Sequence, residues 1–443
     1  MKTRIYNARI LTMENEREIF DGEIQIEDGL ITRVIPCEKE EGNSGSGARA
    51  SLAGQDRDSG QWDQEIDAGR NLIMPGFKNA HTHSPMTFLR SYADDMKLQE
   101  WLFDKVFPAE AKLTGEDVFW LTKLAVMEYL TSGITSVFDM YKLKEESARA
   151  AVETGFRMVL CGDINDYGGT VRDVENDFIK YNEKKESLVS YQIGFHAEYT
   201  TSRELMEQLS KLADKYKAPV NVHCSETKKE VEECRERSGM TPVAYMDSLG
   251  LFRHGGGLFH GVHMDDSDFE ILRERNICVV TNPASNLKLA SGIAPVKRYL
   301  DMGIPVAVGT DGPASNNCLD MFREMFLVTG LQKVLCDDPE AVPAVDVLKM
   351  AVTNGAHVMG LDDCDSIAAG KRADLIMIDL MQPNMHPLQN IEKNIVYSAS
   401  KQNVKMTMIN GKILYQDGTF KIGETPERIY ENVGRISERI LGK

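Results

Sequence analysis

Long apolar runs are missing from this sequence. No stretch of the 443 residues approaches the ~20 consecutive apolar residues that a membrane-spanning helix needs. The N-terminal segment MKTRIYNARILTMENE carries Lys2 and Arg4 but no apolar core behind them, which is the pattern of a first β-strand and not of a signal peptide. We therefore expect a protein that is neither inserted in a membrane nor secreted.

Paired cysteines and clusters of basic residues are missing as well. The eight cysteines are spread along the chain without a C-x-x-C pair, which argues against a disulfide framework or a zinc ribbon and predicts reduced thiols in a cytoplasmic protein. The net charge is −17, and Lys and Arg do not cluster, so the chain should repel phosphate backbones and anionic lipid surfaces. Nucleic acid and membranes are therefore not expected as partners.

The residue pattern at both ends of the chain is typical of short β-strands. Alternating runs before residue 36 are joined by the turn signal Asp28-Gly29, and similar runs return after residue 365. The simplest arrangement is one small β-sandwich domain built from residues 1–71 and 365–424. Residues 38–64 are polar and rich in Gly and Ser, which predicts a mobile surface loop. Residues 425–443 have the apolar spacing of a C-terminal packing helix.

Between these ends, residues 72–364 alternate short apolar runs with helix-like segments such as Glu116–Leu130 and Arg203–Tyr216. Strands buried on both faces read as continuous apolar runs. Eight such runs favour an α/β fold with a (β/α)8 TIM-like barrel, for which ~250 residues is typical, and a doubly wound sheet is the structural alternative. The eight runs are Leu72–Phe77, Ile134–Met140, Met158–Ile164, Tyr191–His196, Val220–His223, Leu258–His263, Ile277–Thr281 and Val306–Thr310.

Histidine is scarce, with nine residues, and several of them fall where strands end. His81 and His83 follow the first run, His223 ends the fifth, and Asp311 follows the eighth. Because all strands of a parallel barrel open onto one face, these side chains should converge. Three neutral imidazoles and one carboxylate suit a zinc or iron ion that keeps a position open for water. One histidine at a strand end is more often structural, and Asp311 alone could cap a helix, so the joint pattern carries the prediction.

A carboxylate lies close to the third predicted ligand. Glu226 follows His223 by three residues, and such a glutamate can carry protons beside a metal site without binding the metal. Read alone, Glu226 could equally be a solvent-facing residue of the next helix. His196 and His260 end the fourth and sixth runs and should reach the same face.

Several motifs together resemble the amidohydrolase superfamily. The segment Met74–His83 is similar to its opening signature, and later segments resemble its cytosine-deaminase-like branch, most of all the S-adenosylhomocysteine/5′-methylthioadenosine deaminase family. These later segments are His223–Glu226, Phe259–Gly261, Thr281–Asn286, Gly309–Asn317 and the tail motif Gly370–Leu375. The resemblance covers nearly the whole chain. It implies a metal-dependent hydrolytic deaminase that converts adenosine-type nucleosides to inosine-type products and ammonia.

The resemblance also implies a role for individual residues. The positions that match the metal ligands are His81, His83, His223 and Asp311. Glu226 matches the carboxylate that carries protons to the substrate. His260 matches the histidine that assists the attacking water, together with Asp311. Binuclear relatives have a lysine at the end of strand four, where this chain has His196, so one divalent ion per chain is implied, with zinc expected and iron open.

Three further positions match substrate contacts. Glu110 matches the residue that holds the ribose hydroxyls, and Arg157 and His196 match additional contacts. Without the resemblance, Glu110 and Arg157 would be interpreted as ordinary surface charges. The expected partner is thus a small-molecule nucleoside, and we also expect a homo-oligomer.

Alternatives remain open at this point. The chain could act on another heterocycle, as a deaminase or chlorohydrolase of guanine, 8-oxoguanine, cytosine or a triazine, but Glu110 favours a nucleoside because a bare base has no ribose hydroxyls. It could also be a catalytically silent scaffold, although the intact ligand set and Glu226 argue against this. The sequence does not choose among adenosine, 5′-deoxyadenosine, 5′-methylthioadenosine and S-adenosylhomocysteine.

Overall fold

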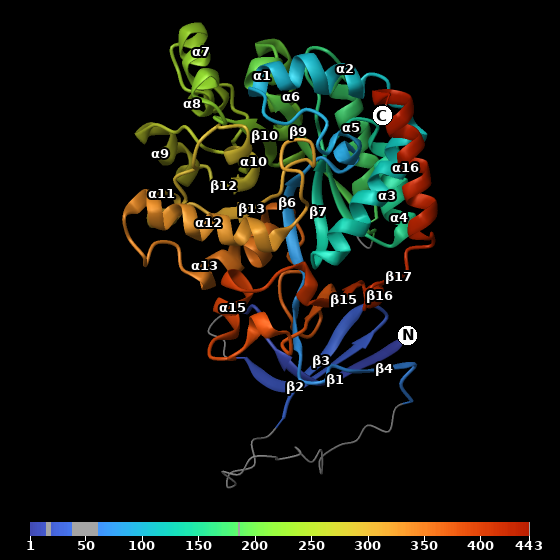
Figure 1. Cartoon of the computed structure of the whole chain (residues 1–443). Helices are drawn as coiled ribbons and strands as arrows, with labels where there is room; N and C mark the ends of the chain where they lie inside the picture. Colours follow the sequence, from blue (N-terminus) through green and yellow to red (C-terminus); the bar gives the residue numbers. More distant parts are fainter. Residues whose placement is uncertain (15–18, 38–60, 185–186, 443) are drawn as a thin grey trace.

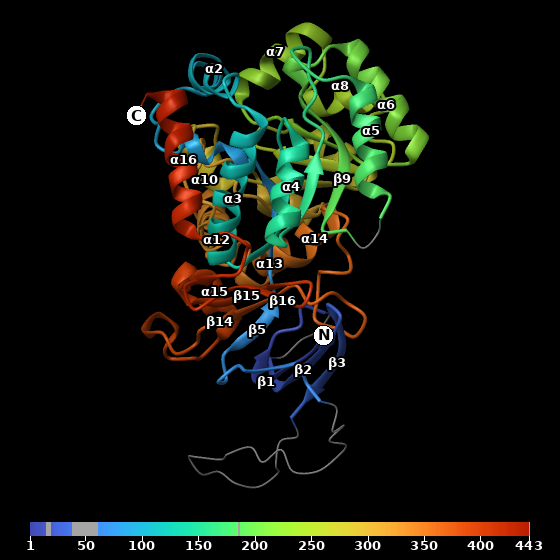
Figure 2. The ribbon, with the colours of Figure 1, turned by 90° about the vertical axis from the view of Figure 1, so that its right-hand side faces the viewer.

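The computed structural model describes residues 1–14, 19–37, 61–184 and 187–442. A barrel wrapped by helices forms the larger part, and a smaller sheet lies against one end of it (Figure 1). Turning the molecule by 90° keeps this two-part arrangement in view (Figure 2). Within the described ranges, every helix is too short or too polar to cross a membrane.

Eight parallel strands form the barrel, and they follow one another in sequence order. They are β6 (Phe77–Thr82), β7 (Ile134–Met140), β8 (Arg157–Cys161), β9 (Val189–Ala197), β10 (Val220–Cys224), β11 (Gly256–His260), β12 (Ile277–Thr281) and β13 (Val306–Val308). The first and last strands meet where Asn79 Nδ2 donates to Thr310 Oγ1 at 2.7 Å. The predicted TIM-like barrel is therefore confirmed, and the doubly wound alternative is wrong.

The barrel strands form where the sequence has apolar side chains for both the inner and the outer face of the barrel. Phe138 and Phe259 point into the barrel and pack together there, whereas their neighbours Val137 and Leu258 pack in the larger core under the helices. Every residue of β7 and β10 is buried. This two-sided burial explains why the runs are continuously apolar.

Helices surround the barrel and close one of its ends. The outer helices are α3 (Gly115–Thr131), α4 (Lys144–Thr154), α5 (Val171–Asn182), α6 (Arg203–Tyr216), α7 (Lys228–Ser238), α8 (Pro242–Ser248), α9 (Asp266–Glu274), α10 (Pro283–Lys288), α11 (Val296–Asp301), α12 (Met321–Cys336), α13 (Ala344–Lys349) and α14 (Gly355–Val358). Short helices α1 (Leu98–Trp101) and α2 (Phe107–Glu110) lie over the end where the strands finish (Figure 1). Two predicted helices correspond to α3 and α6, and α3 starts at a capping box between Thr114 and Asp117.

The smaller sheet has nine strands drawn from both ends of the chain. They are β1 (Lys2–Ile10), β2 (Phe20–Glu27), β3 (Leu30–Pro36), β4 (Gln64–Asp67), β5 (Leu72–Pro75), β14 (Leu375–Ile378), β15 (Val404–Ile409), β16 (Lys412–Gln416) and β17 (Thr419–Phe420). The two ends join where β5 pairs with β14 in antiparallel register, Pro75 opposite Leu375. Among the described residues, both ends of the chain thus contribute strands to one sheet, which packs on a shared apolar core.

Two predicted boundaries differ from the structure. The run Leu72–Phe77 is not one barrel strand, because β5 belongs to the smaller sheet and β6 begins at Phe77. The chain crosses between the two parts at Gly76, where a Cβ atom would lie 2.1 Å from Thr135 Cγ2. Of the predicted loop 38–64, residues 38–60 lie outside the described residues, and Gln64 already belongs to β4.

The C-terminal segment packs back on the barrel. After α15 (Ile391–Tyr397) and the last strands, α16 (Pro426–Leu441) lies along α3 (Figure 1). Ile429, Ile436 and Ile440 are its buried face, and Arg439 forms an ion pair with Asp117 at 2.5 Å.

Candidate active site

A cavity of about 850 Å³ opens at the ends of the barrel strands. Because the strands are parallel, their carboxyl ends all face this cavity. Its floor carries most of the predicted site residues, namely His83, His196, His223, Glu226, His260 and Asp311. Its wall and roof include Trp101, Leu102 and Phe107 from the segment of α1 and α2.

The four predicted ligand side chains converge on one point of the cavity floor. His223 Nε2 lies 3.1 Å from His81 Nε2 and 3.4 Å from His83 Nε2. Asp311 Oδ1 lies 3.5 Å from His81 Nε2 and 3.2 Å from His83 Nε2. A tetrahedral ion with Zn–N bonds of ~2.0–2.1 Å separates its ligand atoms by ~3.3–3.4 Å. The donor set therefore fits one zinc-sized ion in both chemistry and spacing.

Neighbouring groups hold these ligands in a metal-binding orientation. The Nδ1–H of His83 donates to Met140 O at 2.5 Å, and that of His223 donates to His196 O at 2.7 Å. Each bond leaves the Nε2 lone pair facing the convergence point. The buried Asp311 carboxylate accepts hydrogen bonds at Oδ2 from Ser285 and Ser315, at 2.6 and 2.7 Å, so its Oδ1 stays turned toward the histidines.

Burial sets the protonation of the histidines. It lowers the pKa of His81 to about 3 and the pKa of His223 well below its usual value. Both rings are therefore neutral at pH 7, the form in which imidazole binds metals. Burial would also lower the pKa of His83, but the hydrogen bond to Asp311 outweighs it and raises this pKa to about 9. Metal binding would displace that proton.

Glu226 and His260 lie beside this cluster. Glu226 Oε2 is 3.9 Å from His260 Nε2, and both side chains are buried. Burial raises the pKa of Glu226 above its ordinary value, because the buried site disfavours the charged carboxylate. The Nδ1–H of His260 donates to Asn286 Oδ1 at 2.8 Å, so its Nε2 is left to accept a hydrogen bond.

The sequence pattern does not reveal the residue that holds the Glu226 side chain. Ser291 Oγ donates to Glu226 Oε1 at 3.1 Å. The backbone N–H of Glu226 donates in turn to the Glu230 carboxylate at 2.9 Å. Ser291 lies just after α10 and belongs to no strand end, so the strand-end argument has no means of finding it.

The backbone at the site adopts an uncommon conformation. Ser225, His260 and Asp311 have φ values of 53°, 76° and 58°, which place these non-glycine residues in the left-handed region. Such conformations persist where surrounding contacts impose them, and they concentrate at functional sites. Two of the three, His260 and Asp311, line the cavity.

The structure brings two of the three predicted substrate contacts to the cavity. Glu110, at the end of α2, is buried, and its Oε1 accepts a hydrogen bond from Tyr141 at 2.5 Å. Burial raises the pKa of Glu110. His196 lines the same cavity, with its Nδ1 2.8 Å from Thr200 Oγ1.

Arg157 is not among the residues that line the cavity, so the structure does not bring this predicted substrate contact to the site. Arg157 begins β8, whereas the cavity lies beyond the other end of that strand, ~13 Å away at 3.3 Å per residue. Its Nε and Nη2 donate to Asp374 at 2.6 and 3.1 Å, and both residues are buried. The sequence already indicated this position, because Arg157 precedes its apolar run whereas the residues on the cavity floor lie at or after the ends of theirs.

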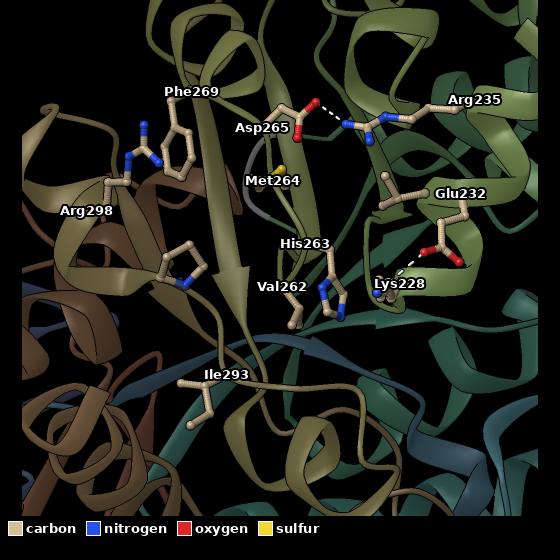
Figure 3. Close-up of a pocket in the computed structure, with 12 residues that line it drawn as sticks. Lys228, Glu232, Arg235, Val262, His263, Met264, Asp265, Phe269, Ile293 and Arg298 are labelled. Atoms are coloured by element: carbon tan, nitrogen blue, oxygen red, sulfur yellow. Dashed lines mark hydrogen bonds and ion pairs between the residues drawn. The ribbon is translucent and has the colours of Figure 1, made fainter. Parts of the chain in front are cut away.

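A second hollow of about 370 Å³ lies outside the barrel between α7, α9 and α11 (Figure 3). Its charged groups are already engaged, since Arg235 pairs with Asp265 and the Arg298 guanidinium stacks 4.0 Å above the Phe269 ring. His263 donates from Nε2 to Ser291 O at 2.7 Å. A residue of this hollow thus contacts the backbone of Ser291, the residue that holds Glu226.

Comparisons with known proteins agree with this geometry. The model described as the amidohydrolase family matches residues 72–414. A protein of Desulforamulus reducens named 5-methylthioadenosine/S-adenosylhomocysteine deaminase is 39% identical over 445 residues, covering 99% of each chain. A 5′-deoxyadenosine deaminase of Methanothermobacter thermautotrophicus is 40% identical over 371 residues, covering 82% of this chain and 87% of the relative. The crystal structure of a Xanthomonas campestris adenosine deaminase with bound zinc is similar over 100% of this chain and 99% of its own, with a TM-score of 0.90 and 29% identity.

Proposed function

The chain belongs to the amidohydrolase family, and from this we propose that it is a metal-dependent deaminase that hydrolyses the 6-amino group of adenosine-type nucleosides. The products are an inosine-type nucleoside and ammonia. One observation carries the proposal: four converging ligand atoms, a buried glutamate and a histidine share the floor of a cavity whose wall holds the buried Glu110.

His81, His83, His223 and Asp311 are proposed to hold one divalent ion, with zinc preferred over iron. When bound, such an ion lowers the pKa of a water molecule toward ~7 and so makes a nucleophile available at neutral pH. The spacing of the four ligand atoms and the zinc in the similar adenosine deaminase support this choice. His196 stands where binuclear relatives carry a lysine, which supports a single ion.

The remaining residues move protons and position the reactants. Glu226, held at Oε1 by Ser291, is free at Oε2 to deliver a proton to ring nitrogen N1, which makes C6 more electrophilic. His260 accepts a hydrogen bond from the attacking water at Nε2. Asp311 receives the proton of that water at Oδ1. That proton then passes to the amino group, which departs as ammonia, and the hydroxyl proton left at C6 returns to Glu226 as the C6=O bond forms.

Glu110 is proposed to select nucleosides over free bases. Its buried carboxylate has one hydrogen bond, from Tyr141, and further acceptor capacity toward the cavity. Two ribose hydroxyls would fill that capacity. A base without ribose would leave the charged group undersolvated, at a cost of at least ~1–3 kcal/mol. Sites built around a substrate hydroxyl can reject analogues that lack it by up to ~10⁴–10⁵-fold.

The test is a comparison of kcat/KM by ammonia release. The substrates are adenosine, 5′-deoxyadenosine, 5′-methylthioadenosine and S-adenosylhomocysteine, beside adenine, guanine and cytosine. We expect at least one nucleoside to exceed every free base. A free base that exceeds all the nucleosides would refute the role of Glu110, and a metal-loaded protein without activity on any of these compounds would refute the proposed function.

A further inference from the structure

Helix α12 is apolar on the side that faces away from the barrel. Val334, Leu335 and Phe326 are 81%, 52% and 50% exposed. Figure 1 shows α12 as an outer helix, next to α11. Outer helices normally carry charged residues on the solvent face, as α7 does with the sequence KKEVEECRERS. Single exposed apolar residues are common, but here three lie on one helix of a chain whose net charge is −17.

A line of five residues runs along this outer face. At 3.6 residues per turn, Arg323, Phe326 and Val334 lie within ~40° of Gly330, on one side of it or the other, and so does the Cα atom of Asp337, the C-cap residue of α12. All but the half-buried Gly330 are exposed. A Cβ atom at Gly330 would meet nothing within 4 Å. Glycine inside a helix is destabilising relative to alanine, and no contact among the described residues requires glycine at this position.

The line is symmetric about Gly330. Phe326 and Val334 are each four residues from it, and Arg323 and Asp337 are each seven residues from it. An antiparallel helix that crosses at Gly330 would therefore set Phe326 against the partner's Val334 and Arg323 against the partner's Asp337. The absent side chain at Gly330 allows the two helices to approach closely at the crossing point.

The charges of the line are unpaired within the described chain. Neither the Arg323 nor the Asp337 side chain has an ion-pair partner among the residues that the structure describes. The carboxylate of Asp337 also lies at the C-terminus of α12, where the helix dipole disfavours a negative charge. An antiparallel partner would supply an arginine at each end.

We propose that the outer face of α12 binds the same face of a second copy of this chain, around a two-fold axis at Gly330. A two-fold interface requires one surface to be complementary to itself. The symmetric order of the five residues meets this requirement, with opposite charges at the two ends and apolar groups between them. The cavity lies at the end of the barrel covered by α1 and α2, so the proposed interface leaves its entrance open (Figure 1).

The test is the mass of the full-length protein by sedimentation velocity over a range of concentrations. We expect twice the 49.6 kDa of one chain. Arg323→Asp and Asp337→Arg should each weaken the dimer at least ~10-fold, because each creates two like-charge contacts per dimer. The double variant carrying both changes restores opposite charges and should return the dissociation constant to within ~3-fold of wild type. Val334→Glu should also weaken the dimer.

Met381→Glu is the matched control, because Met381 is 69% exposed and belongs to the segment between β14 and α15 and not to α12. Circular dichroism and ammonia release verify that each variant is folded. A wild-type protein that is monomeric at every concentration would overturn the proposal. So would an oligomer that neither Arg323→Asp nor Val334→Glu weakens, or a double variant that dissociates as readily as the single ones.

Discussion

Replacing Arg157 by alanine should destabilise the protein without removing its chemistry. The Arg157 guanidinium and the Asp374 carboxylate are buried and joined by two hydrogen bonds of 2.6 and 3.1 Å. Removing one partner of such a pair leaves the other charge buried and uncompensated, which typically costs ~3–5 kcal/mol. Lys78 lies near Asp374 and offsets part of this, so we expect the lower end of the range.

The assay combines unfolding with kinetics. The free energy of the first urea transition should fall by ~3 kcal/mol, whereas kcat/KM measured at low temperature should stay within ~3-fold of wild type, because Arg157 lies ~13 Å from the cavity end of its strand. The variant Arg157→Met with Asp374→Asn is the control. It removes both charges and keeps an acceptor for the Asn410 N–H, so most of the stability should return.

The dependence on pH gives an independent check. Burial alone would raise the pKa of Asp374, but Arg157 outweighs this and lowers it. In wild type, this carboxylate therefore stabilises the fold above its unfolded pKa and loses that effect as pH falls through the folded value. Without Arg157 its pKa should rise, and the variant should take up a proton as pH falls. The difference in the free energy of unfolding between wild type and the Arg157→Ala variant should therefore become smaller toward acid pH. An Arg157→Ala variant that is as stable as wild type but has lost most of its kcat/KM would refute the structural role of Arg157.

The other predictions concern the site directly. Glu226→Gln should lower kcat by ~10²–10⁴-fold while elemental analysis still finds the metal; unchanged turnover would exclude Glu226 as the proton carrier. Ser291→Ala should lower kcat by ~10-fold or more with little change in KM, because it removes a hydrogen bond to a charged group that is worth ~1.5–3 kcal/mol. Ser291→Thr keeps the hydroxyl and should recover kcat; equal activity in both variants would contradict the contact. Glu110→Gln should raise KM for nucleosides more than for free adenine, and parallel changes would argue against a ribose contact. Chelation should abolish activity, and added zinc should restore it with one ion per chain at saturation; two ions at full occupancy would contradict the single site.

The barrel and the convergence of its strand ends were predictable because both follow from short-range pattern. Continuous apolar runs such as Ile134–Met140 signal strands buried on both faces, and strand direction then fixes where His223 and Asp311 must meet. The same reasoning places Arg157 away from the cavity, because Arg157 is the first residue of its strand and the cavity lies beyond the last one. The resemblance to a family placed it at the site, and the position within the strand was the better guide.

Other features depend on long-range contacts that no local pattern encodes. The run Leu72–Phe77 looks like one strand, but the close approach of Thr135 to Gly76 divides it between two sheets. Ser291 acquires its role only because the segment after α10 passes over Glu226, 65 residues away in sequence. Hydrogen-bond partners of this kind follow from the closed barrel and not from the residues around them.

The nine-stranded sheet contains strands from both ends of the chain, so it cannot be completed until late in synthesis. β5 pairs with β14, and Pro75 cannot meet Leu375 until nearly the whole chain has been synthesised. At ~5–20 residues per second, that interval is ~15–60 s. Throughout it, β5 lacks its neighbour and presents an unpaired edge, which is the kind of surface on which nascent chains aggregate. The barrel strands after β6 need no such wait, because each of them pairs with the barrel strand made just before it.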